Sequence, residues 1–115
     1  MARAAVGGPI EVRDLGLLQA ALLRPQTSLF GQDAYPDLFV KAASLLHSVV
    51  ANHPFVDGNK RAGWLLAYVF LAKNGVELDP ADDDEAYDLV IAVASGKLSE
   101  ADEIADVLRT FIPSS

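Results

Sequence analysis

The fold is decided by one apolar stretch, Trp64–Leu71, with the sequence WLLAYVFL. Together with its flanks, this stretch predicts a helix from about Asn59 to Lys73. The pair Asn74-Gly75, which suits left-handed backbone, ends that helix. Because the stretch is apolar on every side of a helix, other helices are expected to surround it. We therefore predict a central apolar helix at 59–73.

The segments on both sides predict four more helices. Apolar residues recur at intervals of three and four over 11–24, 37–51 and 100–112, as amphipathic helices require. A fourth helix is expected at 83–94, between an acidic loop and Ser95-Gly96. The alternation typical of strands does not persist beyond a few residues. The prediction is an all-α fold, with one domain over residues 1–115 built as a helical bundle around a central apolar helix.

The pattern also predicts faces and ends of these helices. The first segment places three leucines on one face, Leu15, Leu18 and Leu22. The last segment places four apolar residues on one face, Ala101, Ile104, Leu108 and Phe111. Ser99 with Asp102 resembles a capping box at the start of that last helix. Proline terminates three of the segments, at Pro25, Pro54 and Pro113.

Composition narrows the classes of function. The chain has 115 residues, a net charge of −7 and no cysteine, so disulfides and thiolate metal sites are excluded. With nine Lys and Arg residues against sixteen Asp and Glu, it is too acidic for sequence-independent binding to nucleic acid. We find no apolar run long enough to cross a bilayer and no signal peptide. We expect a cytoplasmic protein with no direct contact to nucleic acid or membrane.

Some residues allow both a functional and a structural interpretation. The acidic run Asp79–Glu85 lacks the spacing and the glycine of a calcium loop, so a helix N-terminus is the favoured interpretation. His47 is expected to be a core or interface histidine rather than a metal ligand. Three aromatic residues are expected in the core, Trp64, Tyr68 and Phe70. Tyr35 and Tyr87 are candidates for stacking on an adenine.

The segment His53–Arg61, HPFVDGNKR, has more functional groups than packing requires. Lys60 and Arg61 fall in the first turn of the predicted central helix, where the helix dipole makes cations unfavourable by about 0.3–1 kcal/mol each. A bound anion would make the two cations favourable there, and free N–H groups at a helix N-terminus form an anion site. Gly58-Asn59 tolerates the turn that directs those groups to one point. Two cations beside such a nest suit the phosphates of a nucleotide.

Two more side chains in this segment fit phosphoryl transfer. His53 can remove a proton from an attacking hydroxyl. Asp57, next to bound phosphates, can hold Mg²⁺, which keeps most of its water ligands. Phe55 is expected to pin the loop to the core. A base, a metal carboxylate and an anion nest within nine residues predict an enzyme of this class.

The motif HPFVDGNKR resembles the signature of the Fic/Doc family, HxFx(D/E)GN(G/K)R, and the flanking segments 35–47, 69–75 and 94–98 resemble Doc-like members. Lys60 and Trp64 point to the Doc (death-on-curing) branch, because adenylylating members usually carry glycine and often arginine at these positions. The resemblance implies an all-α bundle with His53 as general base and Asp57 on Mg²⁺. It also implies that Gly58 and Asn59 form the phosphate nest and that Lys60 and Arg61 bind the phosphates.

The resemblance further implies a toxin of a Phd–Doc toxin–antitoxin system. Such a toxin transfers a phosphate from ATP to a threonine of elongation factor Tu and arrests translation, and a Phd-type antitoxin binds it. Two alternatives stay open: a Fic-type adenylyltransferase that transfers AMP, and a catalytically impaired interaction module with the same fold.

Two positions depart from the family pattern. Many Doc-like chains have arginine where this chain has Ala51, and loss of a group that stabilises charge predicts weakened activity. Only Met1–Val6 precede Gly7-Gly8, so the first family helix is expected to be missing or shortened. Apolar surface left uncovered by that helix is expected to bind an antitoxin helix or a second copy of the chain.

Overall fold

The computed structural model of the chain describes residues 11–26, 28–29, 32–33, 35, 37–79 and 83–112. In this part lie five α-helices, α2 (Leu15–Leu23), α3 (Leu38–Asn52), α4 (Asn59–Lys73), α5 (Asp83–Ala94) and α6 (Ala101–Arg109). A 3₁₀ turn, η1 (Arg24–Gln26), and a two-residue antiparallel pair, β1 (Ser28–Leu29) with β2 (Gln32–Asp33), connect α2 to α3. The all-α prediction is confirmed. The prediction about Met1–Val6 lies outside the described residues.

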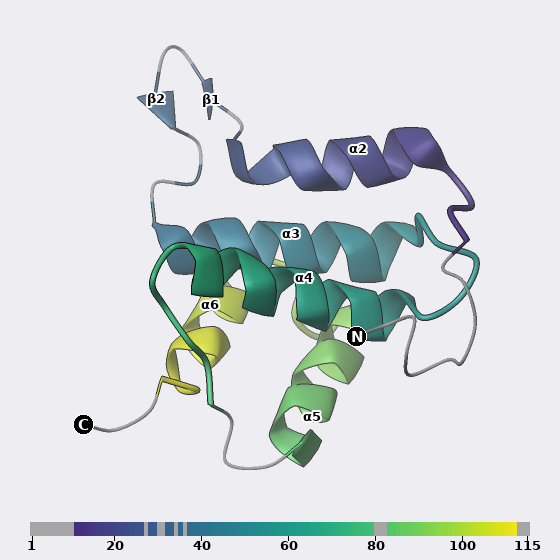
Figure 1. Cartoon of the computed structure of the whole chain (residues 1–115). Coiled ribbons are helices and arrows are strands. Elements are labelled where there is room, and N and C mark those ends of the chain that lie inside the picture. The colour runs from purple at the N-terminus through teal and green to yellow at the C-terminus, as the bar shows by residue number, and fades with distance from the viewer. Residues whose placement is uncertain are drawn as a thin grey trace.

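The bundle is built around α3 (Figure 1). α2 lies along one side of α3, α4 runs beside it, and α5 and α6 lie on the side away from α2. Helix α3 packs against all four of these helices, whereas α4 packs mainly against α3 and α5 and leaves Val69 exposed. The bundle has a central helix as predicted, but α3 has neighbours on more sides than the apolar α4.

The sequence of α3 explains its central place. Its first turn is capped by Asp37, whose Oδ1 accepts hydrogen bonds from the backbone N–H of Phe39 at 2.7 Å and of Val40 at 3.3 Å. Small side chains at Ala42 and Ala43 are fully buried and allow neighbouring helices to approach closely. The helix ends at Asn52, before a proline, as predicted.

Two hydrophobic clusters hold the helices together. The larger one joins α3, α4, α5 and α6, and its fully buried side chains include Leu46, Leu71 and Ile104. The smaller one joins α2, α3 and the start of α4, and it contains Ala21, Leu45, Val49, Phe55 and Ala62. Because Phe55 of the loop between α3 and α4 belongs to this second cluster, the cluster anchors the predicted functional segment.

The structure confirms the predicted apolar face of the last helix, but the leucine face of α2 is largely exposed and the predicted capping box is wrong. The four apolar residues predicted on one face of the last helix are all buried. On α2 the predicted face is largely uncovered: Leu15 and Leu22 are exposed, and Ala21 is the buried residue. The capping box on Ser99 and Asp102 is wrong. α6 begins one residue later, and the backbone N–H of Glu100 donates to Glu103 Oε1 at 3.3 Å.

None of the described helices is both long and apolar enough to span a bilayer.

Candidate active site

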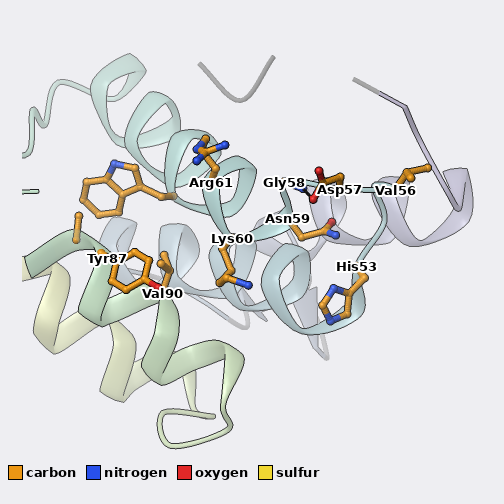
Figure 2. A pocket seen from close by; sticks show the side chains of 11 residues that line it. His53, Val56, Asp57, Gly58, Asn59, Lys60, Arg61, Tyr87 and Val90 are labelled. Carbon is orange, nitrogen blue, oxygen red and sulfur yellow. Dashed lines mark hydrogen bonds between the residues drawn. The ribbon is translucent and has the colours of Figure 1, made fainter. Parts of the chain in front are cut away.

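An open pocket of about 820 Å³ lies at the start of α4, between the loop that follows α3 and one face of α5. All six residues predicted for the site line it, namely His53, Asp57, Gly58, Asn59, Lys60 and Arg61 (Figure 2). The far wall of the pocket consists of Trp64 on α4 and Ala86, Tyr87 and Val90 on α5. The structure therefore places all six of these residues at one pocket.

His53 lies at the C-terminal end of α3 in left-handed backbone geometry, with φ 53° and ψ 57°. The proline that follows it disfavours the right-handed helical conformation, so the chain turns here. Its imidazole is exposed at the pocket, whereas Pro54 and Phe55 are buried directly after it. Phe55 packs in the smaller cluster, which confirms that it pins the loop to the core.

The side chain of Asn59 holds this loop closed. Its Oδ1 accepts from the Phe55 backbone N–H at 3.0 Å, and its Nδ2 donates to the Phe55 carbonyl at 3.1 Å. Both groups of the amide are thus used in a buried position. Within the predicted phosphate nest, the contribution of Asn59 can come only from its backbone N–H.

The N-terminus of α4 has the features of an anion site. Gly58, the N-cap, has φ 75° and has no side chain to accept from the helix. The backbone N–H groups of the first turn, at Asn59, Lys60 and Arg61, therefore have no intrahelical acceptor, and no acidic residue lies in that turn. Such free donors at the positive end of a helix dipole attract negative charge.

Asp57 stands beside these donors. Its Oδ1 accepts from the Gly58 backbone N–H at 2.8 Å, so that N–H is not free for a phosphate in this arrangement. No group of three or more metal-binding His, Asp or Glu side chains occurs among the described residues. A divalent ion at Asp57 would therefore need further oxygen ligands, and this fits Mg²⁺ that is held jointly by one carboxylate, phosphate oxygens and water.

Lys60 and Arg61 are exposed cations that pair with no carboxylate in the described part of the chain. Figure 2 shows Lys60 pointing to the side on which His53 and Tyr87 lie, whereas Arg61 points to the opposite side of the helix. The two cations do not converge on one point, because consecutive residues on a helix face different directions. The Lys60 and Arg61 side chains can therefore bind two separate groups of oxygen atoms.

The aromatic residues divide between the pocket and the core. Trp64 packs edge-on against Phe111, with ring centroids 5.8 Å apart, and one part of it also lines the pocket. Tyr87 is 60% exposed at the pocket wall, as stacking on a base requires. Tyr35 is not at this site. Its hydroxyl accepts from Arg24 Nε at 3.1 Å, and it lines a separate cavity of about 420 Å³.

His47 has a structural place, as predicted. Its Nδ1 lies 2.9 Å from Arg24 Nη1, and the same nitrogen of Arg24 donates to Ser48 Oγ at 2.9 Å. Partial burial, and then the neighbouring Arg24 charge, lower the pKa of His47 below its usual value. α5 begins at Asp83, within the acidic run, so the helix start that was favoured for this run is confirmed, while residues 80–82 of the run lie outside the described residues.

Two arginines that contact α3 were not singled out from the sequence, and only Arg13 lies near the site. Arg24 joins η1 to α3 through the contacts with Tyr35, His47 and Ser48. Arg13 contacts the backbone at the end of α3. No pattern in the sequence marks them, because both act on partners more than ten residues away. Ala51 is exposed on the last turn of α3 and does not line the pocket.

Comparison with known proteins gives three matches. A family model described as the Fic/DOC family matches residues 2–71. The chain is 50% identical over 108 residues to Toxin Doc from Mycolicibacterium smegmatis, which covers 93% of this chain and 82% of that protein. It is 34% identical over 103 residues to Protein kinase doc from Escherichia phage P1, which covers 90% of this chain and 79% of that protein.

Proposed function

Because the chain belongs to the Fic/Doc family, we propose that it is a toxin that transfers the terminal phosphate of ATP to a hydroxyl group of a protein. One observation carries the proposal: an uncapped helix N-terminus opens into the pocket that His53 also lines, with two cations that pair with no carboxylate among the described residues. The name of the phage relative, a protein kinase, supports phosphate as the transferred group.

Each group at the pocket has a separate role in the proposed transfer. The free N–H groups of the first turn of α4 bind phosphate oxygens, with Lys60 and Arg61 on two sides of the polyphosphate. Asp57 would hold Mg²⁺ together with those phosphates, and the bound ion would supply positive charge beside the transferring group. His53 accepts the proton of the target hydroxyl as its oxygen bonds to the γ-phosphorus, while the bond to the bridging oxygen breaks and ADP leaves.

The far wall suggests where the base lies. Tyr87 is exposed and lies at the end of the pocket away from His53 in Figure 2. Trp64 is half-buried and also lines the pocket. Aromatic faces can stack on an adenine. We place the adenine there, with the phosphates toward the start of α4.

The experiment that tests the reaction uses ATP labelled at the α or at the γ position. Transfer of the γ label alone supports the kinase, and transfer of the α label identifies an adenylyltransferase. His53→Ala should abolish transfer and leave the fold intact, because the exposed imidazole contributes little to packing. If neither label is transferred and Ala51→Arg makes no difference, the chain is an impaired interaction module instead.

The target and the partner belong to the same proposal. We propose elongation factor Tu as the target, arrest of translation in the cytoplasm as the effect, and a Phd-like antitoxin as the partner. The name Toxin Doc of the bacterial relative supports a toxin and hence an antitoxin. Growth arrest on expression, followed by mass measurement of elongation factor Tu, tests this directly, with the His53→Ala variant as the control.

A further inference from the structure

Arg13 lies outside the pocket, yet it contacts the backbone that carries His53. Its Nε donates to the His53 carbonyl oxygen at 2.8 Å, and its Nη2 donates to the Asn52 carbonyl oxygen at 3.0 Å. Carbonyls at the C-terminal end of a helix have no intrahelical donor. The Arg13 guanidinium supplies that donor to two consecutive carbonyls, and its charge suits the negative end of the α3 dipole.

The backbone around Arg13 reinforces the contact. The N–H of Arg13 donates to the Pro54 carbonyl at 2.7 Å, and the N–H of Val56 donates to the Glu11 carbonyl at 2.9 Å. Val12 and Phe55 form an isolated antiparallel bridge between the two segments. The segment 11–14 therefore runs alongside the loop that leads from His53 into the pocket.

His53 needs such support. It is the one non-glycine residue with positive φ among those that the structure describes. A side chain other than glycine occupies this backbone region only where surrounding contacts hold it there. The peptide that carries the bond to Arg13 directly follows the His53 Cα, so its orientation helps to set the direction of the imidazole.

We infer that Arg13 is a positioning residue: its guanidinium holds the last carbonyls of α3 and so fixes the direction in which His53 presents its imidazole to the target hydroxyl. The inference rests on the proposed role of His53 as the general base. Arg13 is itself exposed and contributes no side chain to either hydrophobic cluster. Its replacement should therefore disturb the site more than the fold.

The test compares Arg13→Met and Arg13→Lys with the control Arg109→Met. Arg109 Nη2 pairs with Asp37 at 3.1 Å, so this control removes an arginine that acts on the opposite end of the same helix. We expect Arg13→Met to lower kcat about 10- to 100-fold while the KM for ATP changes less than about twofold, as for a misplaced catalytic group. Lysine should restore part of the rate, since an ammonium group can still bond a carbonyl.

A second measurement does not depend on activity. NMR signals of the His53 ring and amide should shift in Arg13→Met, and not in Arg109→Met, while circular dichroism shows each variant to be folded. If the wild type transfers no phosphate, the proposed function fails. The NMR signals of His53 then still test whether Arg13 positions His53. Unchanged His53 signals and an unchanged kcat in Arg13→Met would overturn the inference. An equal loss of kcat in Arg109→Met would overturn it too, because the effect would then be one of general stability. If Arg13→Met does not fold, Arg13→Lys carries both measurements.

Discussion

Asn59 connects the family motif to the stability of the loop. Its side chain satisfies both the N–H and the carbonyl of Phe55 in a buried position. Asn59→Ala would leave two buried backbone groups without a partner, at a cost of about 1–3 kcal/mol for each group that water cannot reach. We expect the free energy of unfolding, measured by urea denaturation, to fall by about 2 kcal/mol or more.

Asn74→Ala is the matched control for that prediction. The Asn74 Nδ2 donates to the Phe70 carbonyl at 2.8 Å, but this bond lies in an exposed position at the end of α4. Water can replace it, so the loss should stay below about 1 kcal/mol. Equal losses in the two variants would mean that the Asn59 amide has no special role in closing the loop.

His47 makes the stability of the fold depend on pH. Its pKa in the folded chain lies below the usual value of 6.5 because of partial burial and the charge of Arg24, against a smaller opposing effect of Glu100. The unfolded chain therefore binds this proton more readily, so stability is complete above about pH 6.5 and is lost as the pH falls toward the folded-state pKa. The slope cannot exceed about 1.4 kcal/mol per pH unit, because only one proton is involved, and solvent around the partly exposed ring keeps the total change small.

Urea denaturation between pH 5 and 8 measures this dependence in the wild type and in His47→Gln. Glutamine keeps an acceptor for Arg24 but does not titrate, so the difference in stability between the two proteins isolates His47. A difference that stays constant over the whole range would show that His47 does not cause the dependence.

At the scale of the elements, α3 and α4 approach each other closely at Gly63. A Cβ atom at this position would lie 2.6 Å from Val50 Cγ2 and 3.3 Å from the Leu46 carbonyl oxygen. Valine is stiff in a helix, so the helices would have to move apart. Overpacking of about 1–3 kcal/mol should outweigh the gain of up to about 1 kcal/mol in helix propensity. We expect Gly63→Ala to lower the melting temperature and to weaken any activity of the adjoining pocket.

Gly16→Ala provides the contrast for Gly63→Ala. Gly16 is exposed near the start of α2, and the nearest atom to a new Cβ is the carboxylate Oδ1 of Asp14 at 3.3 Å. This variant should change the melting temperature much less than Gly63→Ala does. The close atom here belongs to the side chain that caps α2 and can shift by a few tenths of an ångström, while the helix gains propensity. If Gly16→Ala lowered the melting temperature as much as Gly63→Ala, the loss in Gly63→Ala could not be attributed to the close approach of α3 and α4.

The elements also show how far the sequence could predict this molecule. The bounds of α4 agree with the prediction, because Gly58 at its start and Asn74-Gly75 at its end are local signals. The exposed leucine face of α2 could not be predicted, because burial depends on which neighbours arrive from elsewhere in the chain. The same holds within the site. The motif predicted every residue at the start of α4, whereas the opposite directions of Lys60 and Arg61 and the support from Arg13 depend on three-dimensional arrangement.

At the scale of the whole molecule, large apolar side chains are exposed along α2 and the loop beside it. They are Val12, Leu15, Leu22, Leu23 and Val56. Large exposed apolar patches on soluble proteins commonly mark sites of association. Uncovered apolar surface was expected from the sequence, and α2, whose leucines were predicted to share one face, supplies most of it.

We expect this surface to make the isolated chain associate as its concentration rises. Leu15 and Leu23 are each 61% exposed, so replacing both by glutamine should change the free energy of unfolding by no more than about 0.5 kcal/mol per site. Light scattering should show a mass that rises with concentration for the wild type and stays at one chain for the double variant. A single-chain mass for the wild type at every concentration would contradict self-association. A large loss of stability in the double variant would show instead that the two leucines are covered within the chain itself.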